Sequence, residues 1–101
     1  MAILTKIGVT SDIPRGSGKV IEVAGKTLAV FNCDGKFYAT DNTCKHRGGP
    51  LGDGSLSGTT VTCPWHGWEY DVTTGVCTLD ESVKVQSFPV KVESDEIWVS
   101  L

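Results

Sequence analysis

Four residues of two metal-binding types occur in two short clusters of the chain. Cys44 and His46 form the first cluster, and Cys63 and His66 form the second, each with the cysteine before the histidine. The chain has only two histidines, and both lie within three residues of a cysteine. Thiolate sulfur and imidazole nitrogen together suit zinc, copper or an iron–sulfur cluster. The sequence therefore predicts a metal site built from these four side chains.

The order of the ligands separates two kinds of metal site. Zinc fingers usually take two cysteines from one turn and two histidines from another, whereas here each turn supplies one of each. That mixture suits a two-iron cluster, in which Cys44 and Cys63 bind one iron while His46 and His66 bind the other. A zinc-stabilised interaction domain is the alternative that uses the same four residues.

Both loops resemble the cluster-binding loops of Rieske [2Fe–2S] proteins. The first runs from Cys44 to Leu51 as CKHRGGPL, and the second runs from Cys63 to Asp71 as CPWHGWEYD. The likeness extends over nearly the whole chain and is greatest to the small ferredoxins that supply electrons to bacterial ring-hydroxylating oxygenases. It implies one [2Fe–2S] cluster per chain, with His46 and His66 facing solvent as the exit for electrons.

Glycines and aromatic residues surround the predicted ligands. Glycine lets the backbone approach a metal closely and take positive φ, which directs N–H groups at sulfur. We expect this of three glycines: Gly48, Gly49 and Gly67. Aromatic side chains can cover the loops with apolar surface and keep water from the sulfurs. We expect this of Trp65, Trp68 and Tyr70.

The two remaining cysteines are predicted to be buried thiols. Cys33 alternates with Ala29 and Phe31 along an apparent strand, and Cys77 follows the turn at Gly75. An even number of cysteines in a secreted domain would suggest a disulfide framework. Here two of the four are explained as ligands and no export signal is visible, so no disulfide is expected.

Short strands joined by turns are predicted along the whole chain, with no helix, which indicates an all-β fold. They cover residues 3–8, 19–24, 27–33, 36–40, 58–62, 68–72, 76–79, 85–92 and 96–101. Strands 19–40 should form a meander that turns at Gly25-Lys26 and at Asp34-Gly35, because Asp-Gly is a strong hairpin signal. Pro89 cannot donate to a ladder, so its strand should lie at a sheet edge or contain a bulge. The resemblance specifies a Rieske-type antiparallel β-sandwich base with a cluster-binding subdomain at about residues 42–79.

Length and charge fit one compact domain of residues 1–101 that acts on neither nucleic acid nor a membrane. Apolar residues make up 40% of the 101 residues, without a run long enough to cross a bilayer. The N-terminal residues do not resemble a signal peptide, so we expect a cytoplasmic protein. The net charge of −3 argues against nucleic acid, whose phosphates need a basic surface.

Missing motifs narrow the function to electron transfer. The resemblance implies that a terminal oxygenase needs further histidines for a mononuclear iron, and this chain has none to spare. No glycine-rich dinucleotide motif is present, so flavin and nicotinamide belong to another protein. We therefore expect a monomeric carrier, not an enzyme, between an NAD(P)H-dependent flavoprotein reductase and a terminal oxygenase. The small Rieske-type subunit of an assimilatory nitrite reductase is the alternative.

Partners are expected to dock transiently at the end that carries His46 and His66. Electrostatic steering raises the rate of such encounters without tight binding. Five carboxylates within or just beyond the cluster region would favour a basic patch on the partner: Asp53, Glu69, Asp71, Asp80 and Glu81.

Overall fold

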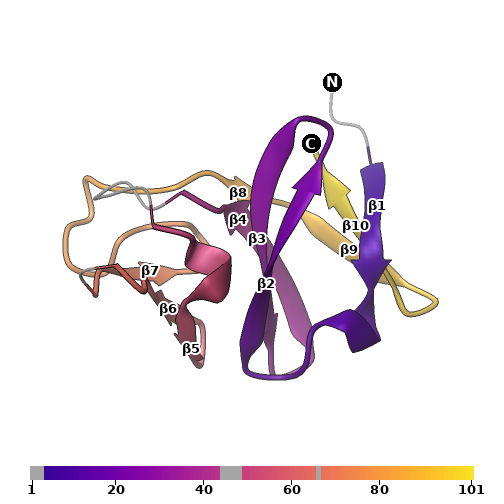
Figure 1. The fold of residues 1–101 in the computed structure, drawn as a ribbon, viewed down its shortest axis with the longest axis horizontal. Helices are drawn as coiled ribbons and strands as arrows, with labels where there is room; N and C mark the ends of the chain where they lie inside the picture. The colour runs from indigo at the N-terminus through magenta and orange to yellow at the C-terminus, as the bar shows by residue number, and fades with distance from the viewer. Residues whose placement is uncertain (1–3, 44–48, 66) are drawn as a thin grey trace.

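The protein is built almost entirely from antiparallel β-strands, which a computed structural model describes for residues 4–43, 49–65 and 67–101 (Figure 1). These residues contain ten strands in three small sheets. Across the first sheet the order is β1 (Leu4–Val9), β10 (Glu96–Ser100) and β9 (Val90–Glu93). Across the second it is β2 (Ser17–Val23), β3 (Lys26–Cys33), β4 (Lys36–Asp41) and β8 (Ser87–Phe88). Across the third it is β5 (Ser55–Ser57), β6 (Thr60–Thr62) and β7 (Glu69–Asp71). The first two sheets form the base, and the third is the small sheet. The predicted all-β fold is confirmed.

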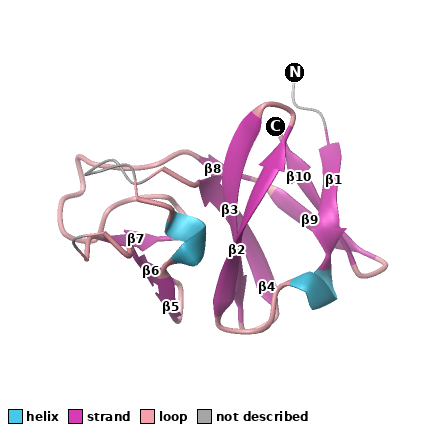
Figure 2. Ribbon diagram, in the orientation of Figure 1, coloured by secondary structure: helices cyan, strands magenta, loops and turns pink. Residues whose placement is uncertain are grey.

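Two single-turn 3-10 helices interrupt the strands, although the sequence predicted no helix (Figure 2). They are η1 (Thr10–Asp12), between β1 and β2, and η2 (Leu51–Asp53), between the small sheet and β2. Each has only three residues, so periodicity could not reveal it. Among the described residues, no helix has the length and apolar character needed to cross a bilayer.

The meander of β2, β3 and β4 matches the sequence prediction except at one turn. Asp34 and Gly35 have φ of 55° and 94°, which are the two positive values that a tight I′ hairpin turn requires. The preceding turn lies at Ala24 and Gly25, with φ of 51° and 75°, one residue earlier than predicted. Val23 pairs directly with Lys26, so Lys26 is already the first residue of β3.

β3 is buried on both faces and contributes to two hydrophobic cores. Along a strand, successive side chains point to opposite faces. Ala29, Phe31 and Cys33 therefore pack in the core below the small sheet, whereas Leu28 and Val30 pack in the core of the base. The partners in the first core are Leu51, Val61, Cys63, Tyr70, Val72, Cys77 and Val85. The partners in the second are Ile13, Ala39, Phe88, Ile97 and Val99.

The small sheet differs in detail from its prediction. The strand predicted at 58–62 begins at Thr60 because Gly58 lies in a turn with φ of 59°. That turn joins β6 to β5, a strand that was not predicted. The predicted strand 76–79 is reduced to isolated bridges, of Cys77 with Tyr70 and of Val76 with Lys84.

Pro89 divides the strand predicted at 85–92 into β8 and β9. β8 pairs with β4 and β9 pairs with β10, so the chain passes from one sheet of the base to the other at the proline. Both strands lie at sheet edges, as predicted for a residue without an N–H group. The Pro89 carbonyl still accepts a hydrogen bond from the Ser100 N–H, at 2.9 Å.

Gly75 provides a test of the packing beneath the small sheet. A Cβ atom at Gly75 would overlap the Val85 carbonyl oxygen, whereas Gly16 has a similar φ, 79° against 83°, and nothing within 4 Å. Gly75→Ala is expected to lower the free energy of unfolding by about 2–5 kcal/mol, and Gly16→Ala by only about 1–2 kcal/mol. Chemical denaturation of both variants measures the difference. Equal losses would show that Val85 moves away without cost.

Candidate metal centre

Cys63 is a buried thiol at the end of β6. Cys63 is only 1% exposed, and its side chain belongs to the core that β3 shares with the small sheet. The Cys63 N–H donates to the Trp68 carbonyl at 2.7 Å, just beyond the pairing of Thr62 with Glu69. Residues 63–68 thus form the tight connection between β6 and β7, in which Gly67 has the expected positive φ, 75°. The hairpin fixes one end of this loop relative to the other.

The first loop is closed at its base by a short antiparallel contact. Thr43 forms an isolated bridge with Pro50, and the Leu51 N–H donates to the Asn42 carbonyl at 2.8 Å. Cys44 and His46 belong to the segment between these contacts. Both lie outside the described residues, as does His66 in the second loop. Asn42 was not predicted from the sequence to take part in closing this loop, because only its contacts in the fold distinguish it from an ordinary loop residue.

Gly49 brings the two loops together. A Cβ atom built on Gly49 would lie 2.6 Å from Cys63 Sγ and 3.1 Å from Trp65 Cβ. Real Cβ atoms do not approach other atoms so closely, so only a glycine fits between the loops without a shift. Gly49 thus approaches a predicted ligand closely, whereas the approach to a metal that we expect of it stays a prediction. Of the four predicted ligands, the structure therefore describes Cys63, and it places this thiol against the loop that contains Cys44 and His46.

This arrangement fits a cluster held between the two loops. The Cys63 sulfur lies against the backbone of Gly49 in the opposite loop, so a group bound to this sulfur would be bordered by both loops. Two thiolates and two imidazoles form the donor set of a cluster with mixed ligation. The residues present thus fit the cofactor that the motif implies.

The aromatic residues of the second loop lie at three different depths. Tyr70 is fully buried in the core below the small sheet, and Trp68 is half-buried and packs against that core. Trp65 is 51% exposed, so it covers less of the loop than expected. It adds apolar surface to the exposed part of the second loop.

Cys33 and Cys77 are buried, as predicted, and neither forms a disulfide. Burial raises the pKa of the Cys33 thiol, and the carboxylate of Asp71 raises it further. A raised pKa disfavours the thiolate, which is the form that binds metal and attacks electrophiles. Cys33 is therefore a packing residue.

Comparison with known proteins supports the same kind of centre. The family model of the Rieske [2Fe-2S] domain matches residues 4–89. The ferredoxin component of the naphthalene 1,2-dioxygenase/salicylate 5-hydroxylase systems of Ralstonia sp. is 38% identical over an alignment 93 residues long, which covers 89% of this chain and 88% of that protein.

Two solved structures share the fold. One is a chain in the complex of reduced oxygenase and oxidized ferredoxin of carbazole 1,9a-dioxygenase, with a TM-score of 0.88, 33% identity and coverage of 97% of this chain and 93% of that chain. The other is the NADH-dependent nitrite reductase small subunit from Mycobacterium tuberculosis, with a TM-score of 0.91 and 22% identity, covering 100% and 96%. At that identity the second likeness concerns the fold alone.

The contact between Gly49 and Cys63 predicts that a larger side chain will empty the centre. Gly49→Val should displace the Cys63 sulfur or separate the loops, and iron per chain should fall to about half or less because ligation depends on geometry. Iron analysis of protein purified under anaerobic conditions measures this effect. Ser57→Val is the control, because it adds the same side chain at an exposed position of the small sheet. Full iron content in Gly49→Val would show that the loops are free to move apart.

Proposed function

The chain belongs to the Rieske [2Fe–2S] domain family, and we propose that it carries single electrons from an NAD(P)H-dependent flavoprotein reductase to a terminal aromatic-ring oxygenase. A [2Fe–2S] cluster of the Rieske type takes up and releases one electron. The chain is thus a component of an oxidoreductase system and not itself the enzyme. We further propose that it works as a monomer in the cytoplasm, where NAD(P)H is available to its reductase.

The proposed ligands are Cys44 and Cys63 on one iron and His46 and His66 on the other. Support comes from the buried Cys63 thiol and from the close approach of Gly49 in the opposite loop. Within this scheme the protein binds the cluster, excludes water from the sulfur side and leaves the histidine side for the partner. Zinc bound by the same residues would have no redox role.

One observation carries the choice of partner. Relatives that are 33% and 38% identical over most of both chains are ferredoxins of aromatic-ring dioxygenase systems, and one of them is in complex with its oxygenase. The nitrite reductase subunit shares the fold at 22% identity, which supports no shared partner. The oxygenase is therefore the partner that we propose.

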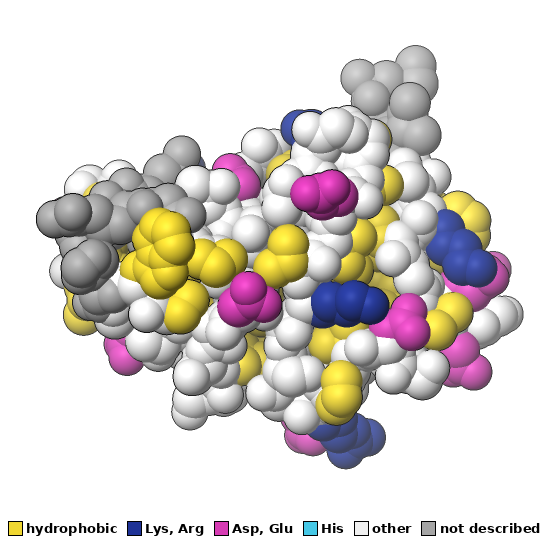
Figure 3. Space-filling model, viewed as in Figure 1, with side chains coloured by type: hydrophobic (Ala, Val, Ile, Leu, Met, Phe, Trp, Pro, Cys, Tyr) yellow, Lys and Arg dark blue, Asp and Glu magenta, His cyan; other side chains and the backbone are white. Residues whose placement is uncertain are grey.

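An apolar surface at the cluster end suits transient docking. Pro64 and Trp65 are exposed in the second loop, and Leu79 is exposed as well. Its neighbour Thr78 donates its N–H to the Glu69 carbonyl at the start of β7, at 2.9 Å, which places Leu79 near the end of the second loop. Figure 3 shows hydrophobic side chains gathered at the end of the molecule that carries the small sheet. Electron-transfer contacts are small, so a few apolar side chains supply much of the buried area.

Carboxylates outnumber basic residues in this part of the chain. Residues 42–81 contain Asp53, Glu69, Asp71, Asp80 and Glu81 against two basic residues, Lys45 and Arg47. Hydrogen bonds from the Ser82 hydroxyl and N–H lower the pKa of Asp80, so this exposed carboxylate is charged at neutral pH. A basic patch on the oxygenase or on the reductase would be attracted to it.

The ligand assignment predicts different results for two buried cysteines. Cys63→Ala should lose the cluster, because one iron is left with a single thiolate. Cys33→Ala should retain two irons and two acid-labile sulfides per chain, since it alters only the core. Iron and sulfide analysis, with the EPR spectrum of the reduced protein, measures both. A full cluster in Cys63→Ala, or zinc in place of iron in the wild type, would contradict the assignment.

The docking surface predicts a selective loss of electron transfer in a Trp65 variant. Trp65→Ala should slow reduction of the terminal oxygenase by about tenfold, because aromatic side chains are typical anchors of interfaces. Leu4→Ala is the control: Leu4 is 46% exposed, similar to Trp65, but lies on β1 at the opposite side of the base (Figure 1). Stopped-flow mixing of the reduced protein with the oxygenase of a naphthalene dioxygenase system measures the rate.

Two results would count against this surface. Equal rates for Trp65→Ala and Leu4→Ala would place docking elsewhere. Rates that do not change between low and high ionic strength would remove the contribution of the carboxylates, because salt screens exposed charges.

A further inference from the structure

Asn42 is a buried polar residue at the point where β4 leads into the first ligand loop. It is 8% exposed and lies two residues before Cys44. A buried amide side chain is costly unless it is hydrogen-bonded. Its bonds therefore show what the residue does.

The main chain and side chain of Asn42 bind both ends of the loop. Its N–H donates to the Thr27 carbonyl in β3 at 3.2 Å, which anchors the beginning of the loop to the base. Its carbonyl accepts from the Leu51 N–H, and its side-chain Oδ1 accepts from the Gly52 N–H, both at 2.8 Å. Leu51 and Gly52 begin η2, which follows the loop. One residue thus holds residues 43–50 at both ends.

These bonds also satisfy the start of η2. The first N–H groups of a helix have no partner within it, and Pro50, at the N-cap, has no N–H group at all. The next two N–H groups, of Leu51 and Gly52, both donate to Asn42. The Asp53 N–H and the Gly54 N–H donate within the turn, to Pro50 and Leu51. Without the Asn42 side chain, the Gly52 N–H would be buried and unpaired.

The backbone of η2 also lies directly against β2. A Cβ atom built on Gly52 would lie 2.7 Å from Val20 Cγ2 and 2.9 Å from the Val20 N atom, so the backbone of η2 is in close contact with the strand. The turn therefore cannot shift toward β2. The hydrogen bonds of Asn42 add a second restraint on η2.

We propose that Asn42 is a positioning residue of the metal centre, which sets the place of Cys44 and His46 by fixing the two ends of their loop. The inference rests on the proposed function, since it takes Cys44 and His46 as ligands. Asn42 itself does not contact the iron in this proposal. Its effect on the centre is transmitted through the loop.

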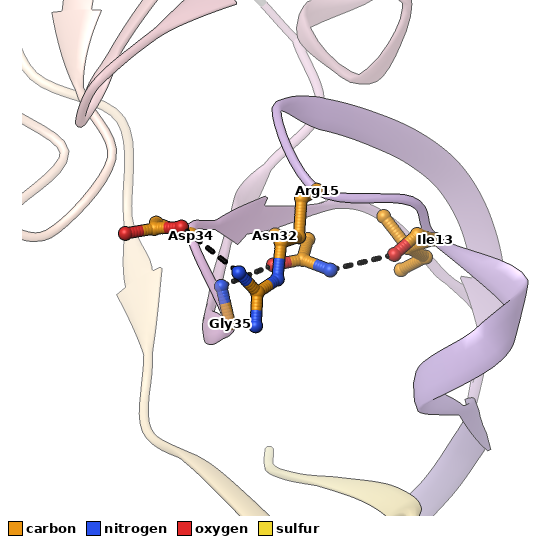
Figure 4. Close-up of polar contacts among 5 residues, drawn as sticks. All are labelled: Ile13, Arg15, Asn32, Asp34 and Gly35. Carbon is orange, nitrogen blue, oxygen red and sulfur yellow. Dashed lines mark hydrogen bonds and ion pairs between the residues drawn. The ribbon is translucent and has the colours of Figure 1, made fainter.

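Asn32 offers a matched control within the same chain. It is 5% exposed, its Oδ1 accepts from the Gly35 N–H at 2.8 Å, and its Nδ2 donates to the Ile13 carbonyl at 2.8 Å (Figure 4). It differs from Asn42 in location, because it supports the Asp34–Gly35 turn of the base. If Asn42 were merely a buried polar residue, leucine at either site would have the same consequences.

The test compares Asn42→Leu with Asn32→Leu in the cluster-loaded protein. Both variants should unfold at lower temperature than the wild type, because Asn42→Leu removes the partner of the buried Gly52 N–H and Asn32→Leu removes the donor to the buried Ile13 carbonyl. At a temperature the same number of degrees below the unfolding midpoint of each variant, Asn42→Leu should also release iron to a chelator about tenfold faster than Asn32→Leu. Asn42→Leu should in addition alter the EPR g-values of the reduced state. Asn32→Leu should keep the wild-type EPR spectrum.

A conservative variant separates the hydrogen bond from other effects of the substitution. Asn42→Asp retains an oxygen that can accept from Gly52, so its iron release should stay within about twofold of the wild type. If Asn42→Leu does not fold, Asn42→Ala takes its place in the comparison. Equal iron release and unchanged EPR spectra for the Asn42 and Asn32 variants would overturn the proposal, as would release from Asn42→Asp as fast as from Asn42→Leu. Wild-type protein without two irons and two sulfides would instead overturn the proposed ligands.

Discussion

The structure depends on a single strand that fills two cores. β3 contributes Ala29 and Phe31 to the core below the small sheet, and it contributes Leu28 and Val30 to the core of the base. Because neither face of this part of β3 meets water, a register shift of one residue would exchange both sets of side chains and damage both cores. The small sheet and the base are therefore held in one relative position. This constraint also fixes the position of Cys63, which packs in the core that β3 shares with the small sheet.

Two further close contacts transmit that geometry to the centre. Gly49 lies against the Cys63 sulfur, which requires the loops to approach without an intervening side chain. Asn42 holds both ends of the first loop through the N–H groups of Leu51 and Gly52. The first contact sets how near the loops are, and the second sets where the first loop begins and ends.

The sequence predicted the features that depend on local chemistry. Asp34 and Gly35 turn as expected because two adjacent residues determine an I′ hairpin, and Gly67 takes the positive φ expected of it in the turn between β6 and β7. It failed where tertiary contacts decide. Pro89 passes the chain between two sheets, and alternation of apolar residues cannot show which sheet a strand joins. The role of Asn42 depends on Gly52, ten residues away, so no local pattern reveals it.

The two ligand loops are anchored to different parts of the molecule, and this gives the cofactor a structural role in our proposal. Asn42 ties the first loop to β3 of the base, where the Thr27 carbonyl accepts its N–H. The second loop belongs to the hairpin of β6 and β7 in the small sheet, closed by the hydrogen bond from Cys63 to Trp68. A cluster bound by both loops therefore joins the base to the small sheet a second time, in addition to the core around β3. A group that binds only the folded chain stabilises it, so cluster binding and the packing of the small sheet reinforce each other.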